Sequence, residues 1–235
     1  MNKIKTTVNY NSDTLYSEDL KGLKLYFRKL SYRDIMKKIE KYCKSVPENI
    51  LEIGAGSGYF LKFIHDKYKD CRTIAIEYDE RLHSTIHNNS SSTKILKENA
   101  EDFNLGQKFD LIVSTHVIEH LYKPGSMIDA IKSHLTVDGT VIITTPNRNC
   151  VAYKIYGSDW NGIRDDHVSL MDLCELRLLL EERGFKIIYE ATTFFSGVKF
   201  MRKLPFRIIN DTLLVIFGSI RWSYGEASIV VAQLK

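Results

Sequence analysis

The chain has 235 residues, of which 44% are hydrophobic, and a formal net charge of +4. A chain of this length can bury one sizeable core, so we expect a single domain over residues 1–235. Its small charge, spread over interleaved basic and acidic residues, gives no indication of a nucleic-acid partner. The cysteines form no C-x-x-C pair, and no signal peptide or membrane-spanning run is visible, which predicts a cytoplasmic protein.

Residues 1–47 are expected to form an N-terminal arm followed by one helix. Up to about residue 30 the segment alternates between polar and aromatic residues with little periodicity. Ser31 can cap a helix whose apolar face then carries Ile35, Met36, Ile39 and Tyr42. Pro47 ends this helix, so the first strand of the core is expected directly after it.

The stretch 49–60, N-I-L-E-I-G-A-G-S-G-Y-F, predicts a strand, a glycine turn and a helix that continues to Tyr68. The glycines stand at alternate positions, Gly54, Gly56 and Gly58. Such glycines permit positive φ angles and let the backbone approach a ligand that a Cβ would exclude. The spacing is not that of the dinucleotide fingerprint G-x-G-x-x-G, because Tyr59 occupies the place of its third glycine.

Strand and helix patterns alternate through the rest of the chain. Apolar, β-branched runs predict buried strands at residues 72–77, 94–97, 109–114 and 140–145. Helices are expected from Pro124 to Leu135 and from Leu170 to Arg183, the second closed by Gly184. Two further strands are expected at residues 185–193 and 227–234. This alternation predicts an α/β fold.

Residues 47–185 resemble the class I S-adenosylmethionine-dependent methyltransferases, in the small-molecule branch (methyltransferase type 11/12/23-like). The likeness rests on Glu52 two positions before G-x-G-x-G, and on the succession F-D-L-I-V-S, E-H-L and D-G-T-V-I-I-T-T-P-N. It implies a doubly wound, mostly parallel, seven-stranded Rossmann-like sheet with helices on both faces and an antiparallel pair of last strands. It also implies the cofactor S-adenosyl-L-methionine, held by a core of residues 48–147.

Cofactor contacts are expected where the strands end. Glu77, at the end of strand 72–77, offers two acceptor oxygens that match the two hydroxyls of a ribose. The resemblance implies that the turn at Asn99 embraces the adenine ring, with the Asn99 carbonyl oxygen accepting from the exocyclic amine. The residues expected to bind the cofactor are Glu52, Gly54, Ala55, Gly56, Gly58, Glu77, Tyr78, Asn99, Ala100, Glu101, Ser114 and Thr115.

Residues 148–170 form a loop that is longer than most connections and rich in Tyr, Trp, Asp and His, so we expect it to bind the substrate. Trp160 could provide a stacking surface. Asp159, Asp165 and Asp166 could accept hydrogen bonds from the hydroxyl groups of a sugar or polyol.

Residues 198–222 form an insertion before the last strand, and its apolar stretch 208–217 has basic flanks. We favour a helix packed on the core or on a second subunit. Contact with a membrane surface is the alternative.

Histidines His116, His120 and His167 are candidates for a general base, because the unperturbed pKa of histidine lies near neutrality. The run His116-x-x-Glu119-His120 also offers metal ligands on one side of a helical turn. It resembles the E-x-x-E-H element that holds a divalent ion in ubiquinone-pathway and small-RNA O-methyltransferases, with His116 in place of the first Glu. In the second group a later histidine completes the site, and His167 stands in a comparable place. Since the E-H-L element of metal-free relatives explains the same residues, we expect no metal.

These observations predict an S-adenosylmethionine-dependent methyltransferase that acts on a small-molecule or carbohydrate-like acceptor, with oxygen favoured over nitrogen as the methylated atom. An N-methyltransferase and a metal-dependent O-methyltransferase stay open within this class. A nicotinamide-dependent oxidoreductase is disfavoured by the glycine spacing. A non-catalytic cofactor-binding protein is disfavoured because the glycine motif is intact. The sequence leaves the acceptor and the oligomeric state open.

Overall fold

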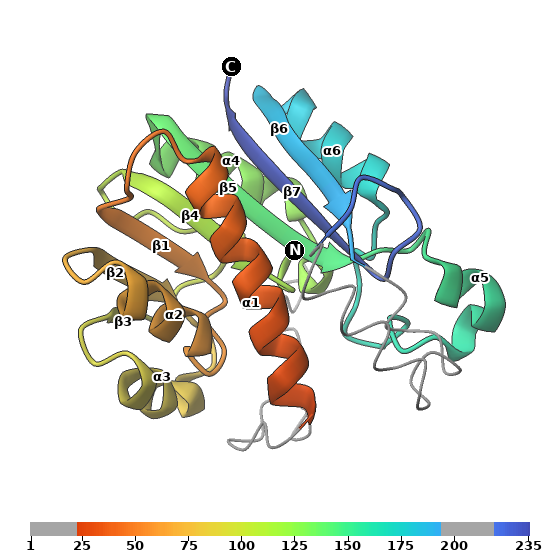
Figure 1. The fold of residues 1–235 in the computed structure, drawn as a ribbon, viewed down its shortest axis with the longest axis horizontal. Coiled ribbons are helices and arrows are strands. Elements are labelled where there is room, and N and C mark those ends of the chain that lie inside the picture. Colours follow the sequence, from red (N-terminus) through yellow and green to blue (C-terminus); the bar gives the residue numbers. More distant parts are fainter. Residues whose placement is uncertain (1–22, 194–218) are drawn as a thin grey trace, which may run out of the picture.

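The computed structural model describes residues 23–193 and 219–235, which form a seven-stranded sheet with helices on both faces (Figure 1). The strands are β1 (Asn49–Ile53), β2 (Arg72–Ile76), β3 (Lys94–Leu96), β4 (Phe109–Thr115), β5 (Leu135–Pro146), β6 (Phe185–Thr192) and β7 (Ala227–Leu234). The α-helices are α1 (Leu23–Tyr42), α2 (Tyr59–Lys67), α3 (His83–Asn89), α4 (Pro124–His134), α5 (Val151–Tyr156) and α6 (Leu173–Glu182). Single turns of 3-10 helix are η1 (Glu80–Leu82), η2 (Ile118–His120) and η3 (Gly157–Asp159).

The strand order is β3-β2-β1-β4-β5-β7-β6, and β7 runs antiparallel to both of its neighbours while the other pairs are parallel. This arrangement confirms the predicted doubly wound, mostly parallel sheet. The order reverses between β1 and β4, which are paired near their carboxyl ends through Ile53 and Ser114. In such sheets the carboxyl ends of the strands at the reversal point form the ligand crevice.

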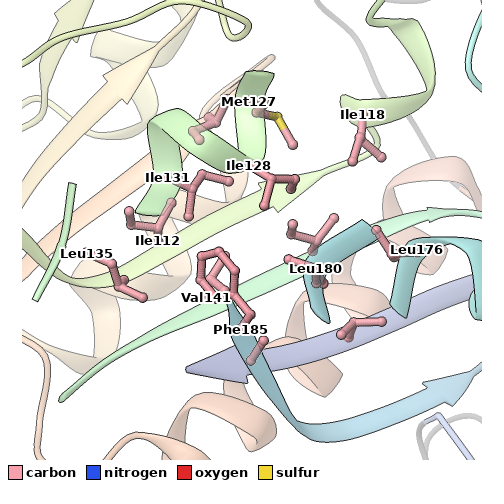
Figure 2. Close-up of a cluster of buried hydrophobic side chains, with 14 of the residues drawn as sticks. Ile112, Ile118, Met127, Ile128, Ile131, Leu135, Val141, Leu176, Leu180 and Phe185 are labelled. Carbon is pink, nitrogen blue, oxygen red and sulfur yellow. The ribbon is translucent and has the colours of Figure 1, made fainter. Parts of the chain in front are cut away.

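One face of the sheet is covered by α4 and α6. Figure 2 shows Ile128 and Ile131 of α4 and Leu180 of α6 close to Ile112 of β4 and Val141 of β5, all of them buried. Side chains from successive strand residues point to opposite faces, so the β-branched strand runs supply both layers of the core. This packing fixes the start of α4, and with it the η2 turn that precedes it.

The opposite face is covered by α1, α2 and α3 (Figure 1). The face of α1 that carries Ile35, Met36 and Ile39 is buried, as its periodicity predicted. Tyr32 of α1 contacts Phe60 of α2, with ring centroids 5.4 Å apart. These contacts hold the helix that begins at the glycine turn against the sheet.

Several boundaries differ from the sequence prediction. Helix α1 already includes residues from Leu23 onward, upstream of the predicted start at Ser31. Helix α6 begins at Leu173 instead of Leu170, because Asp172 and Glu175 form a capping box that fixes the start. Strand β5 begins at Leu135, which pairs with Phe109 of β4 before a bulge. The loop at residues 148–170 contains the short helices α5 and η3.

Residues 1–22 of the predicted N-terminal arm and residues 198–218 of the predicted insertion, including the apolar stretch 208–217, lie outside the described residues. Within the described ranges, no helix is long and apolar enough to cross a membrane.

Candidate active site

The glycine turn after β1 has a backbone that side chains would disturb. Gly54, Gly56 and Gly58 have φ angles of 72°, 54° and 74°, in the left-handed region. A Cβ added to Gly54 would lie 2.3 Å from Cγ2 of Val117, and one added to Gly58 would lie 2.9 Å from Cα of Ile86. The turn is therefore built for glycine on both conformational and steric grounds, as the motif predicted.

Glu77 at the end of β2 is tied to this turn. Its Oε2 accepts a hydrogen bond from the Gly56 N–H at 2.8 Å, and its Oε1 accepts one from the Asp79 N–H at 2.9 Å. Burial raises the pKa of Glu77, and the two backbone hydrogen bonds oppose this rise. Each carboxylate oxygen has a second lone pair, so both can also accept from a ligand hydroxyl.

Three buried polar atoms of the described residues lie without a hydrogen-bond partner on the glycine turn and the two strands at the order reversal. They are Oε2 of Glu52, Oγ of Ser57 and Oγ of Ser114. Glu52 is 1% exposed, and its pKa is raised well above the ordinary value by burial first and by the charge of Glu77 second, while Arg28 opposes the shift. Leaving such groups unpaired costs free energy, so their position at the crevice fits a polar ligand.

The turn predicted to embrace adenine is held by one hydrogen bond within itself and by one to the start of α4. Oδ1 of Asn99 accepts from the Glu101 N–H at 2.9 Å, and Oε1 of Glu101 accepts from the Lys123 N–H at 2.6 Å. The side chain of Tyr78 is exposed beside it. An open groove of about 830 Å³ is lined by residues of this turn, of η2 and of α4. Asn99 can still accept a ligand amine through its second lone pair.

His116 follows β4 with a φ of 55°, and no other non-glycine residue in the described part of the chain has a positive φ. Such a conformation is strained for a residue with a Cβ and is frequent at functional sites. The His116 side chain is 53% exposed, and its Nδ1 lies 3.3 Å from Oε1 of Glu119. The imidazole therefore contacts the carboxylate of the next turn.

Glu119, in η2, is fully buried. Its Oε2 accepts a hydrogen bond from Oγ1 of Thr145 at 3.0 Å, and its backbone carbonyl accepts one from the Ser169 N–H at 2.9 Å. Burial alone would raise the pKa of Glu119, but the hydrogen bond and charge of His116 and the charge of His120 hold it below the ordinary value. Glu119 is therefore a buried carboxylate anion.

His120 and His167 come together although they lie on different segments. Nδ1 of His120 is 2.9 Å from the Asp166 carbonyl oxygen, and Nδ1 of His167 is 2.8 Å from the Gly162 carbonyl oxygen. The rings meet edge to face, with centroids 4.8 Å apart. One ligand atom each from Glu119, His120 and His167 lies within 4.8 Å of the others. Burial lowers the pKa of His167, so the ring is neutral near pH 7.

The predicted substrate residues in the loop have different environments. Trp160 is 2% exposed and packs with Cys150 and Ala152, so the open stacking surface predicted for its ring is absent in this structure. The reason is that the loop forms a small core of its own around the indole. Asp159 is exposed at η3. Asp166 forms a paired contact with Arg164, at 2.9 and 3.0 Å, and its Oδ2 lies 3.4 Å from Nδ1 of His120.

Two site contacts were not anticipated from the sequence. Thr145 donates to Glu119, and the Gly162 carbonyl orients His167. A threonine that ends a strand was a visible signal for the first contact. No local pattern indicates the second, because it depends on how the loop folds around Trp160.

The strand order, the antiparallel β7 and the glycine turn with its buried carboxylate define a Rossmann-like methyltransferase. The family of methyltransferase domains matches residues 25–190. The chain belongs to this family, and S-adenosylmethionine is its cofactor.

Relatives of known activity match parts of the chain. A malonyl-[acyl-carrier protein] O-methyltransferase of Acetivibrio thermocellus is 26% identical over 99 residues, covering 41% of this chain and 35% of the relative. A mitochondrial ubiquinone biosynthesis O-methyltransferase of Dictyostelium discoideum is 26% identical over 154 residues, covering 59% and 46%. The chain thus spans less than half of the length of these relatives.

Solved structures share the fold at low identity. A possible histamine N-methyltransferase of Thermotoga maritima superposes with a TM-score of 0.65 at 17% identity, covering 90% of this chain and 95% of the other. The N-methyltransferase NodS of Bradyrhizobium japonicum, solved with S-adenosyl-L-homocysteine, gives 0.60 at 14% identity and covers 88% and 86%. At these identities the likeness shows the fold alone.

Proposed function

We propose that this chain transfers the methyl group of S-adenosylmethionine to a hydroxyl group of a small or carbohydrate-like acceptor. The observation that carries this proposal is the convergence of Glu119, His120 and His167 at the carboxyl edge of the sheet. Both histidines are held by backbone carbonyls, which leaves their Nε2 atoms able to accept a proton. The curated relatives that match the chain are O-methyltransferases, which supports oxygen as the methylated atom.

Methyl transfer is an in-line displacement, so the protein chiefly supplies proximity, alignment and a place for the proton. The cofactor supplies the methyl group: the acceptor oxygen forms a bond to it while the carbon–sulfur bond breaks. His167 is the first choice for the group that accepts the hydroxyl proton, because it is neutral near pH 7. The buried Glu119 carboxylate offsets the charge of the imidazolium that results. His120 borders the same position, and His116 contacts Glu119.

The cofactor is assigned to the strand ends around the order reversal. Glu77 accepts hydrogen bonds from the ribose hydroxyls, and the backbone of the glycine turn leaves room for the cofactor. The turn at residues 99–101 borders the adenine. Glu52 and Ser114 provide unpaired polar atoms beside it. Residues 148–170 are assigned to the acceptor, with Asp159 and Asp166 as candidate contacts for its hydroxyl groups.

The test is a transfer assay with a panel of hydroxyl and amine acceptors, in which S-adenosylhomocysteine release and the mass of the product are measured. We expect a hydroxyl compound to gain one methyl group. His167→Ala should lower kcat by about 10²-fold or more, the usual contribution of a positioned base. His87→Ala, at an exposed position on α3, is the matched control and should leave kcat unchanged. Transfer to amines alone would contradict the proposal.

A further inference from the structure

In the Glu119–His120–His167 cluster each of the three side chains presents a hydrogen-bond acceptor atom to the other two. A carbonyl oxygen cannot donate a hydrogen bond, so Nδ1 of His120 and Nδ1 of His167 must carry the proton in their contacts with Asp166 and Gly162. In the neutral rings, Nε2 then presents a lone pair. One ring nitrogen of each histidine and one carboxylate oxygen of the fully buried Glu119 lie within 4.8 Å of one another. Acceptors that face one another beside a buried carboxylate are stabilised by a cation or a shared proton between them.

We propose that Glu119, His120 and His167 bind one divalent transition-metal cation. This inference rests on the proposed function and changes one role in it. When Nε2 of His167 binds the cation it cannot also accept the hydroxyl proton, so the bound cation takes over the activation of the acceptor oxygen and the proton is lost to solvent. It departs from the expectation, drawn from the sequence, that the E-H-L turn holds no metal.

The neighbours of the three side chains support this assignment. Histidines that bind a metal usually donate their other N–H to a backbone carbonyl or carboxylate, which fixes the ring orientation. Both histidines do so here. Glu119 is oriented in a similar way, by Oγ1 of Thr145 at 3.0 Å and by Nδ1 of His116 at 3.3 Å. The ligands thus come with the second layer of contacts that a metal site needs.

His116 has a different position from the one that the H-x-x-E-H pattern predicted. The pattern placed it among the ligands on one helical turn. In the structure η2 is a 3-10 turn, and the ligand atoms that lie together come from Glu119, His120 and His167, without His116. Because His116 contacts Oε1 of Glu119, we assign it a positioning role.

The ligand types indicate which cations fit. Two imidazole nitrogens and one carboxylate oxygen suit zinc, manganese, iron or cobalt better than magnesium or calcium, which prefer oxygen ligands. Such ions bind these atoms at about 2.0–2.2 Å, which small rotations of the side chains can reach from the observed separations. Three protein ligands leave coordination positions open. An acceptor hydroxyl bound there would lose its proton more readily.

The experiment measures metal binding directly, without reference to turnover. Full-length protein is dialysed against a chelator and then titrated with zinc alone, manganese alone and magnesium alone, with stoichiometry read by elemental analysis. We expect one equivalent of zinc or manganese per chain and much weaker binding of magnesium. His120→Ala and His167→Ala should each weaken zinc binding at least tenfold, whereas the surface variant His87→Ala should not change it.

Affinity for S-adenosylhomocysteine, measured in every variant, shows that the chain is still folded. Absence of stoichiometric zinc and manganese from the wild-type chain would overturn the metal site. So would unchanged zinc affinity in a folded His167→Ala variant, or magnesium binding tighter than zinc. If the metal is absent while hydroxyl methylation still depends on His167, the proposed function stands and only this inference fails. If the metal binds but hydroxyl compounds are not methylated, the metal site stands and the proposed function fails.

Discussion

Glu77 accepts a 2.8 Å hydrogen bond from the backbone N–H of Gly56, so the carboxylate that ends β2 holds the middle of the glycine turn that follows β1. Its other oxygen holds the Asp79 N–H at the start of the next turn. The group expected to bind the ribose therefore also shapes the loop that admits the cofactor. Cofactor affinity and the conformation of the turn should change together when Glu77 is altered.

The first prediction concerns Glu77→Gln. The amide has the size of the carboxylate but places an N–H₂ donor opposite one of two backbone N–H donors, so one hydrogen bond is lost. Losing a charge-assisted hydrogen bond costs about 1.5–3 kcal/mol, which is roughly tenfold or more in affinity for S-adenosylhomocysteine. Calorimetry measures this affinity. The exposed Asp70→Asn is the matched control, and equal affinities in the two variants would contradict the assignment.

The second prediction concerns the pH dependence of stability and Glu52. Its pKa in the folded chain lies well above 4.5, chiefly because of burial, so the folded protein favours the protonated carboxyl. The stability that this group contributes is complete below the unfolded pKa and is lost as pH rises through the folded value. Glu52→Gln mimics the protonated form at every pH.

The cofactor-free Glu52→Gln variant should therefore melt above the wild type, and the difference in Tm should grow as pH rises above the ordinary carboxyl pKa. Thermal unfolding of both proteins at a series of pH values measures the effect. A difference that stays constant with pH would show that Glu52 is ionised throughout.

The third prediction links Trp160 to His167. The indole is the largest side chain in the core of the loop, and a Cβ on Gly162 would lie 2.2 Å from its ring. The Gly162 carbonyl in turn orients His167. Trp160→Ala removes a buried ring, a change that costs about 3–5 kcal/mol in a packed core, and should release this carbonyl from its position.

We expect Trp160→Ala to lower kcat or raise the acceptor KM while affinity for S-adenosylhomocysteine stays within about twofold, because the strand ends bind the cofactor. Val137→Ala, at an exposed position outside this loop, is the control. Loss of cofactor affinity in Trp160→Ala with acceptor kinetics retained would mean that the loop covers the cofactor instead.

The sequence by itself determined the fold class and the glycine turn. These features are local. The hydrophobic periodicity of strands and helices depends on neighbouring residues alone, and so does the conformational freedom of Gly54, Gly56 and Gly58. The carboxylates Glu52 and Glu77 could also be placed, because the ends of parallel strands share one edge of the sheet.

Only the tertiary structure decided which polar side chains meet. His167 joins Glu119 and His120 because the backbone of Ser169 binds the Glu119 carbonyl and because the loop folds around Trp160. Whether the Trp160 indole is buried or exposed depends on tertiary contacts, which cannot be predicted from the periodicity of the sequence. The left-handed backbone of His116 directs its side chain at Glu119. This conformation could not be predicted from the residue type. Contacts between distant segments depend on packing, and packing is a property of the whole fold.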